Sequence, residues 1–358
     1  MSATSLASTA QALVGAGRGL LAMDESTATC NRRFAAAGIP QTEAARRAYR
    51  ELLVTAPGLG MHVSGAILYD ETIRQSDRQG TRFIDRLVEA GVIPGIKVDV
   101  GAKTLALHPG EKVTEGLDGL RARLQEYARM GARFAKWRAV IGIGDDMPSP
   151  GCITANAHAL ARYAALCQEA GLVPIVEPEV LMDGRHTMQR CGQVTHAVLH
   201  AVFDALDAQG VVLEAMVLKP NMVLPGLDCP GQDGAEASAS EALGAVARAT
   251  LECLQRTVPA AVAGIAFLSG GQSAELASAR LNAMNIGHGV SAERSPWPLV
   301  FSFGRALQQP ALQIWGGDDA NVVASQRALL HRAACNGAAL HGAYVPSMEH
   351  EPALRMAS

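Results

Sequence analysis

The sequence lacks several features that mark common classes of protein. Its seven cysteines are an odd number with scattered spacing and no CxxC pair, which favours reduced thiols over a disulfide framework. No stretch approaches eighteen uninterrupted apolar residues, and no basic segment followed by a long apolar run opens the chain. We therefore expect neither a membrane span nor a signal peptide, and a cytoplasmic location.

An excess of charge of one sign is also missing. The formal net charge is −3 over 358 residues, which gives no electrostatic reason to expect nucleic acid or an anionic membrane as a partner. Charged residues make up 18% and hydrophobic residues 49% of the chain, a balance that argues against disorder and supplies a large core. The charge that matters for function is therefore local.

Short apolar runs that end in a polar residue, glycine or proline recur along the chain. Most are continuous rather than alternating, as in parallel strands that are covered on both faces. Between them lie segments with helical periodicity. The predicted strands are 19–24, 65–70, 95–99, 134–138, 173–179, 214–220, 264–271 and 299–307, and helices are predicted within 36–60 and at 117–131, 154–171 (with Thr154 as N-cap), 192–210 and 235–257.

Alternation of strands and helices over this length predicts an α/β protein, a single-domain (β/α)8 TIM barrel. A doubly wound open sheet is the structural alternative. It would need a glycine-rich turn directly after the first strand, where the sequence instead reads DESTATCNRRF. No linker divides the chain, so we expect one barrel over residues 1–345 and a loose C-terminal tail over 346–358.

Four of these strands end in a charged residue, about every forty residues: Lys97, Lys136, Glu177 and Lys219. In a barrel of parallel strands those ends meet on one face, where catalytic residues gather. Lysine can form a Schiff base with a carbonyl substrate, and a carboxylate can move the protons of that reaction. The strand ends indicate amine chemistry, and they hold no histidine or cysteine for zinc or for Ser-His or Cys-His hydrolysis.

A Schiff-base lysine must be unprotonated part of the time. A second ammonium about 6 Å away disfavours the charged form by roughly 2.8 kcal/mol at an effective dielectric constant of about 20, which is about two pKa units. We therefore expect neighbouring lysines to lower one another's pKa. The residues alone do not identify the nucleophile, although Lys219 is preferred because it follows the most apolar strand.

Two further groups of residues predict anion sites. Backbone N–H groups made accessible by glycine, together with one arginine, form a common phosphate clamp after the last two strands of a barrel. Two such sites on either side of a Schiff-base lysine predict a bisphosphorylated sugar as the substrate. The first group is Ser269, Gly270, Gly271, Gly304 and Arg305, and the second is Ser26, Thr29, Arg33, Lys97 and Arg138.

Two other patterns imitate cofactor or metal sites. Gly15, Gly17 and Gly19 are spaced as in a dinucleotide loop, but they precede the first strand instead of following it. His196 and His200 lie four residues apart on an expected outer helix, as zinc ligands can, but no third ligand is in view. We predict neither a cofactor nor a metal.

Several motifs together resemble the class I fructose-bisphosphate aldolase family. The resemblance runs in order from about residue 15 to residue 345. It implies a barrel enzyme that reversibly cleaves fructose 1,6-bisphosphate in glycolysis or gluconeogenesis without a metal, usually as a homotetramer. The motifs are DEST (24–27), GIKVD (95–99), GLDGL (116–120), FAKWR (134–138), PIVEPE (174–179), LKPNMV.PG (218–226), TVP.AV.GI.FLSGGQS (257–273) and FS.GRALQ (301–308).

Matching motif positions imply a role for each site residue. By this resemblance Lys219 would be the Schiff-base lysine and Glu177 its principal general acid and base. Asp24 would take the hydroxyl proton at the cleaved bond, Lys136 would assist the carbinolamine, and Glu179 would hold the lysine network. Phosphate binding would fall to Ser269, Gly270, Gly271, Gly304 and Arg305 on the ketone side and to Ser26, Arg33 and Lys97 on the other, with Arg46 and Arg138 nearby and Thr29 where the family often has serine.

One departure concerns the end of the chain. The animal branch of the family ends in a tyrosine that reaches the active site, whereas this chain ends in ALRMAS (353–358). Proton transfer at the enamine carbon would therefore need another group or a differently placed tail. Two alternatives stay open: an enzyme that prefers fructose 1-phosphate or a related ketose phosphate, and a catalytically silent barrel used as a binding scaffold.

Overall fold

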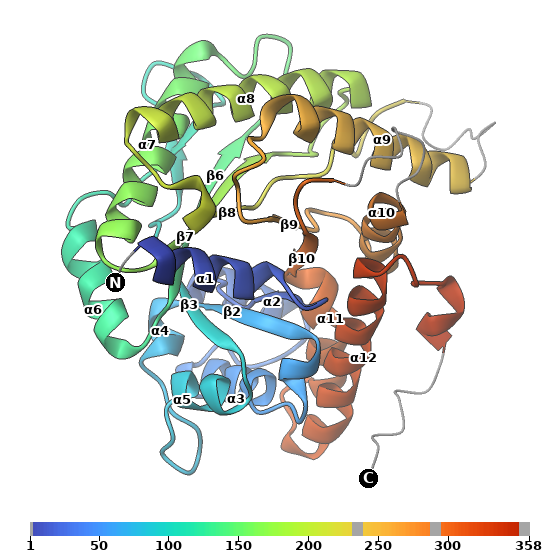
Figure 1. The fold of residues 1–358 in the computed structure, drawn as a ribbon. Helices are drawn as coiled ribbons and strands as arrows, with labels where there is room; N and C mark the ends of the chain where they lie inside the picture. Colours follow the sequence, from blue (N-terminus) through green and yellow to red (C-terminus); the bar gives the residue numbers. More distant parts are fainter. Residues whose placement is uncertain (1–2, 231–238, 287–294, 351–358) are drawn as a thin grey trace.

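Eight parallel strands close into a barrel in a computed structural model that describes residues 3–230, 239–286 and 295–350 (Figure 1). Their order around the barrel is β1-β10-β9-β8-β7-β6-β3-β2. The predicted (β/α)8 barrel is confirmed, and the open sheet is wrong. The strands are β1 (Gly19–Ala22), β2 (Val63–Leu68), β3 (Ile93–Lys97), β6 (Phe134–Ile141), β7 (Val173–Val180), β8 (Val217–Leu218), β9 (Ile265–Phe267) and β10 (Leu299–Phe303).

The strands are continuous apolar runs because both of their faces are covered. All eight residues of β7 are buried, and so are all five of β10. Strand β8 has only two residues, and Lys219 follows it directly. The register of β6 with β7 places Lys136 opposite Ile175 and Arg138 opposite Glu177. Lys136 and Glu177 thus lie on neighbouring strands, as the sequence predicts, but the strands do not end at them: β6 continues to Ile141 and β7 to Val180.

Helices surround the barrel in Figure 1, where α11 and α12 lie side by side at its lower right. The predicted helices are present with shifted ends, except that residues 235–238 of the predicted 235–257 helix lie outside the described residues. Helix α7 starts at Pro150 and not at Thr154, because the Ser149 hydroxyl accepts the Cys152 N–H at 3.1 Å and proline suits the first helical position. The larger helices are α3 (Glu43–Val54), α5 (Phe83–Glu89), α6 (Leu120–Met130), α7 (Pro150–Glu169), α8 (Met188–Ala208), α9 (Ala239–Thr257), α10 (Ala274–Ile286), α11 (Arg305–Trp315) and α12 (Val322–Leu340).

Several helices were not predicted: α5, α10, α11 and α12 are among them, and so are two near the start of the chain. Helix α1 (Ala3–Val14) places Leu6 and Leu13 in a buried apolar cluster with Phe134, so it closes the end of the barrel opposite the strand ends that carry charge. Helix α2 (Thr27–Ala36) follows β1 directly, and Ser26 caps it by accepting the Thr29 N–H at 3.4 Å. Their positions give the barrel one closed end and one open end.

Short elements complete the fold. An antiparallel hairpin, which the sequence analysis missed, follows β3 and extends the open end. These elements are β4 (Ala102–Thr104), β5 (Lys112–Thr114), α4 (Asp70–Ile73), η1 (Leu59–Met61), η2 (Leu213–Ala215), η3 (Asp319–Asn321) and η4 (Pro346–His350).

The segment expected to be a loose tail begins with an ordered turn. Residues Pro346–His350 form η4, whose Glu349 pairs with the buried Arg332 of α12 and accepts the Tyr344 hydroxyl at 2.8 Å. The expectation of a loose tail is therefore wrong for residues 346–350, because a buried guanidinium needs this carboxylate. Residues 351–358 lie outside the described residues.

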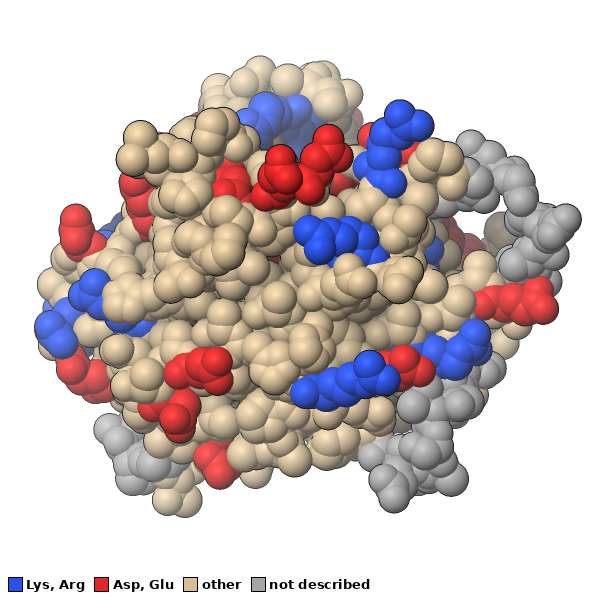
Figure 2. Space-filling model, turned by 90° about the horizontal axis from the view of Figure 1, so that it is seen from above, with Lys and Arg blue, Asp and Glu red and all other residues tan. Residues whose placement is uncertain are grey.

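The surface carries charges of both signs. On the face drawn in Figure 2, blue and red side chains are interspersed and much of the surface between them is uncharged. Within the described ranges, no helix is long and apolar enough to cross a membrane.

Candidate active site

The carboxyl ends of the strands open into a cavity of about 1090 Å³. Most of the predicted site residues line it. They are Asp24, Ser26, Thr29, Arg33, Lys97, Lys136, Arg138, Glu177, Glu179, Lys219, Ser269, Gly270, Gly304 and Arg305. Two predicted residues, Arg46 and Gly271, are not among the lining residues.

Two lysines and two carboxylates form a chain at the bottom of this cavity. Lys136 Nζ lies 2.6 Å from Asp24 Oδ2 and 3.2 Å from Glu177 Oε2. The other oxygen of Glu177 lies 3.1 Å from Lys219 Nζ. The side chains of Lys136, Glu177 and Lys219 are each 4–5% exposed, so these charges interact largely out of water.

Electrostatic attraction decides which of these groups are ionised. Burial by itself raises the pKa of Asp24, but attraction to Lys136 and Lys219 outweighs burial and lowers that pKa to about 2. Burial likewise opposes the charge on Lys136, yet Asp24 and Glu177 raise its pKa well above the ordinary value. The pKa of Glu177 is lowered, since Lys136 and Lys219 overcome its burial. Asp24, Glu177 and Lys136 are therefore charged at neutral pH.

For Lys136, this result corrects the expectation that a neighbouring lysine lowers its pKa. Carboxylates separate the two ammonium groups, and for Lys136 the sign is the opposite of the one expected. Lys136, with two carboxylate partners, keeps its proton: it is a poor nucleophile and a source of fixed positive charge. Lys219 has one carboxylate partner among the described residues, Glu177, which can exchange a proton with its amine.

The wall beside this chain is built from a second set of ion pairs. Glu179 pairs with Arg138 rather than with a lysine. Lys97 Nζ lies 2.5 Å from Asp99 Oδ1, and Asp99 Oδ2 accepts the Arg138 N–H at 3.2 Å. Glu179 thus contacts Arg138, and not the lysines that the family resemblance implied it would hold.

Glycines shape the first predicted anion site. Gly270 has φ +57°, a conformation that favours glycine, and its carbonyl accepts a hydrogen bond from Arg305 Nη2 at 3.0 Å. Gly304 directly precedes α11, so the N-terminus of that helix faces the cavity together with Arg305. The Gly271 N–H instead contacts Met182 Sδ at 3.1 Å, consistent with its place outside the lining.

The second predicted anion site lies at the start of α2. Ser26, Thr29 and Arg33 all line the cavity there. Arg33 pairs with one oxygen of Glu25, and Arg50 Nη1 lies 2.8 Å from the other. Glu25 thereby sets the position of the Arg33 guanidinium at the cavity wall.

Arg46 points elsewhere. It is 8% exposed, and its Nη2 lies 2.6 Å from Glu71 Oε2 while Nη1 donates to Asn31 Oδ1 at 3.0 Å. Its guanidinium is engaged in holding α3 against neighbouring segments, and it does not reach the cavity.

Several lining residues were not predicted. Three of them could have been found from the sequence. Asp70 is the last residue of a predicted strand, Glu25 lies in the DEST motif, and Arg32 is next to the predicted Arg33. Arg74 and Arg123 come from α4's C-terminal end and from α6, where no strand-end pattern points to a site.

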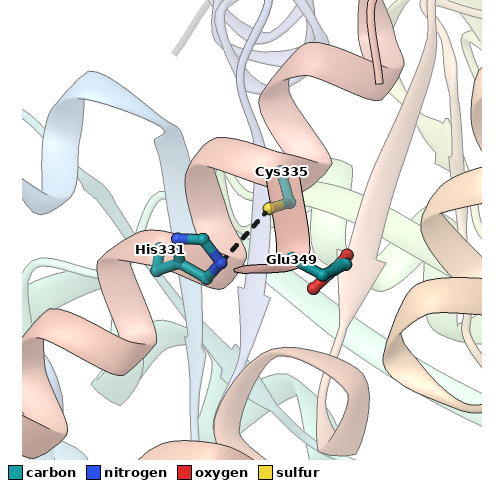
Figure 3. A group of neighbouring side chains, drawn as sticks. All are labelled: His331, Cys335 and Glu349. Carbon is teal, nitrogen blue, oxygen red and sulfur yellow. Dashed lines mark hydrogen bonds between the residues drawn. The ribbon is translucent and has the colours of Figure 1, made fainter. Parts of the chain in front are cut away.

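One group of side chains among the described residues has metal-ligand atoms within 4.8 Å of one another: His331, Cys335 and Glu349 (Figure 3). It lies on α12 and η4, away from the residues that line the cavity. Arg332 already neutralises the Glu349 carboxylate, which a bound cation would have to share. The arrangement fastens η4 to α12, and we assign it a structural role.

Known proteins resemble this chain over nearly its whole length. The family model for fructose-bisphosphate aldolase class-I matches residues 5–356. The chain is 55% identical over 343 residues to a probable fructose-bisphosphate aldolase class 1 of Xanthomonas campestris pv. campestris, covering 96% of this chain and 99% of that protein. It is 52% identical over 328 residues to a cytosolic fructose-bisphosphate aldolase of Arabidopsis thaliana, covering 92% and 88% of the two chains.

A solved structure is similar as well. The fructose-bisphosphate aldolase of Plasmodium falciparum, determined in complex with TRAP and a small-molecule inhibitor, superimposes with a TM-score of 0.90 at 45% identity, covering 96% of this chain and 95% of that one. The chain belongs to the class-I fructose-bisphosphate aldolase family.

Proposed function

We propose that this protein reversibly cleaves fructose 1,6-bisphosphate to dihydroxyacetone phosphate and glyceraldehyde 3-phosphate through a Schiff base on Lys219. The observation that carries the proposal is the position of the Glu177 carboxylate, with one oxygen 3.1 Å from Lys219 Nζ and the other 3.2 Å from Lys136 Nζ. Glu177, a proton carrier, therefore contacts both the candidate nucleophile Lys219 and the fixed positive charge of Lys136, and all three side chains are buried.

Lys219, Glu177 and Lys136 act first, in the formation of the Schiff base. The Glu177 carboxylate takes a proton from the Lys219 ammonium, and the freed amine attacks the C2 carbonyl carbon of the ketose. One N–H proton then passes from the nitrogen to the carbonyl oxygen, which gives a carbinolamine. Protonated Glu177 donates its proton to the leaving hydroxyl, and water departs to leave an iminium. The Lys136 ammonium stabilises negative charge that develops on the oxygen during both steps.

Bond cleavage then uses Asp24. Its carboxylate removes the proton from the C4 hydroxyl, the C3–C4 electron pair moves into the iminium, and the aldehyde leaves an enamine on Lys219. Since the pKa of Asp24 is about 2, the carboxylate is available as a base at any physiological pH. Protonation at C3 and hydrolysis release dihydroxyacetone phosphate and the free lysine.

Two anion sites support a substrate with a phosphate at each end. Gly270, Gly304 and Arg305 would receive the phosphate of the ketone half, with Ser269 beside them. Ser26, Arg33 and Lys97 would receive the other phosphate across the cavity. Because both ends of the cavity carry cationic or N–H groups, this proposal favours the bisphosphate over fructose 1-phosphate.

The cellular setting is part of the proposal. A cytoplasmic enzyme of glycolysis and gluconeogenesis accords with the plant relatives, which are named cytosolic or cytoplasmic isozymes. A homotetramer is the form that the resemblance implies. Sedimentation of the purified protein would test the oligomeric state, with a mass near 37.4 kDa contradicting it.

Turnover on two substrates tests the proposed reaction. We expect kcat/KM for fructose 1,6-bisphosphate to exceed that for fructose 1-phosphate, and activity to persist in EDTA. A reversed ratio would assign the enzyme to the ketose monophosphate. No turnover on either sugar would support a silent scaffold, and loss of activity in EDTA would contradict the metal-free mechanism.

A further inference from the structure

An arginine behind the first anion site has no role so far. Arg280 lies on α10, which packs against α9 and α12. Its Nη1 donates to Gln272 Oε1 at 2.8 Å, and its buried Nε has no hydrogen-bond partner in the part of the chain that the structure describes. Arg280 does not itself line the cavity.

Within the described residues, no carboxylate pairs with this guanidinium. Among the ion pairs within the described ranges, none includes Arg280. Burial alone lowers its pKa, to about 10, with no carboxylate to offset that effect. The side chain still carries its positive charge at neutral pH, and a partly buried charge without a counter-ion is costly. Such a charge is tolerated more readily where an anion binds nearby.

Gln272 connects Arg280 to the anion site. A guanidinium only donates hydrogen bonds, so the Gln272 side-chain oxygen must face Arg280 and its NH2 group must face the other way. That NH2 group donates to the Ser269 carbonyl at 2.9 Å. Ser269 is 5% exposed and lines the cavity next to Gly270. Arg280 therefore determines the orientation of the amide that braces this loop.

We propose that Arg280 is a positioning residue for the phosphate site at Ser269 and Gly270: through Gln272 it holds the loop in its binding conformation, and it places an unbalanced positive charge behind it. The inference rests on the proposed function, since it deepens the assignment of that site to the phosphate of the ketone half. Arg280 is not a catalytic residue, because no reacting atom comes into contact with it.

Binding of inorganic phosphate and kinetics on fructose 1,6-bisphosphate test this proposal. In Arg280→Met, we expect the Kd for inorganic phosphate and the KM for the sugar to rise about tenfold, the effect of one hydrogen bond to a charged group, while kcat stays within about twofold. Arg280→Lys keeps the charge and should recover part of the affinity. Arg327→Met, which removes an exposed arginine from α12, is the matched control and should leave both constants unchanged.

Two results would overturn the inference. One is a folded Arg280→Met protein with the phosphate affinity of the unchanged protein. The other is a fall in kcat with no change in KM or phosphate Kd, which would place Arg280 in the chemical step or in the fold. If Arg280→Met does not fold, Gln272→Met tests the same proposal. Wild-type phosphate affinity in Gln272→Met would contradict the claim that Arg280 acts on the phosphate site through Gln272.

Failure of the proposed reaction would look different. A wild-type protein that does not cleave the sugar contradicts the proposed function, while the phosphate titration still compares the variants. If the wild-type protein cleaves the sugar and Arg280→Met has the same Kd for inorganic phosphate, only the inference about Arg280 is contradicted.

Discussion

Lys136 and Asp24 are in contact at the bottom of the cavity, with Nζ and Oδ2 2.6 Å apart, although Lys136 lies on β6 and Asp24 follows β1, and these strands are not neighbours in the sheet. The contact exists only because the barrel closes. It keeps the Asp24 carboxylate ionised and the Lys136 amine protonated, so the site is polarised before substrate enters. In the proposed reaction Lys136 therefore stays protonated and stabilises negative charge, while Lys219 acts as the nucleophile.

Replacing Asp24 by Asn should separate the two halves of the reaction. Without a base at the C4 hydroxyl, kcat for sugar cleavage should fall about 10²–10⁴-fold. Imine formation with dihydroxyacetone phosphate should persist, as judged by borohydride trapping. Asp146→Asn, an exposed change on the loop after β6, is the control. Equal loss of trapping and cleavage would show that Asp24 serves both steps.

Replacing Glu177 by Gln should affect the earlier step. An amide cannot return a proton to the leaving hydroxyl, so the rate of imine formation should fall about 10²–10⁴-fold. Rapid-mix trapping measures that rate directly. Glu169→Gln removes a surface carboxylate paired with Arg121 and should leave it unchanged. A normal trapping rate in Glu177→Gln would remove Glu177 from proton transfer.

The pH dependence of stability reports the ionisation of Asp24. Its pKa is about 2 in the folded protein against an ordinary 3.8, so its carboxylate stabilises the fold above about pH 4 and loses that effect as pH falls toward 2. The difference corresponds to about 2 kcal/mol. Denaturant titrations of the protein and of Asp24→Asn should therefore differ by a constant amount from pH 7 to about 4.5 and converge below pH 4. Convergence between pH 7 and 5 would mean that the Asp24 pKa is raised instead.

The ion pair between Glu349 of η4 and Arg332 of α12 should contribute to the stability of the fold. Arg332 is 4% exposed in its side chain, so Glu349→Gln leaves a buried cation without its partner and should lower the free energy of unfolding by about 3–5 kcal/mol. Asp319→Asn breaks an ion pair with Arg78, which is half-exposed, and should cost about 0–1 kcal/mol. Urea titrations compare the two. Equal, small losses would show that residues 346–350 contribute little.

The barrel and the centre of the site were open to prediction because each rests on a local pattern. Continuous apolar runs give the parallel strands, and a charged residue at the end of such a run, as at Lys136 or Glu177, has to face a polar site. These signals lie within a few residues of sequence. The site residues found in this way come from strand ends or from family motifs.

Other features depend on contacts that no local pattern records. Arg46 was expected near a phosphate, but Glu71, from a different segment, holds it away. The partner of Glu179 is Arg138 on the neighbouring strand, and only the register of β6 with β7 reveals this. The pKa of Lys136 is raised and not lowered for the same reason, since Glu177 lies between Lys136 and Lys219.

Borohydride trapping with dihydroxyacetone phosphate in the presence of EDTA, followed by peptide mass mapping, tests the central claim most directly. The account predicts an adduct on Lys219, absent from a folded Lys219→Met variant. An adduct on Lys136 or Lys97 would contradict the assignment of the nucleophile. No adduct, with activity lost in EDTA, would contradict the Schiff-base mechanism itself.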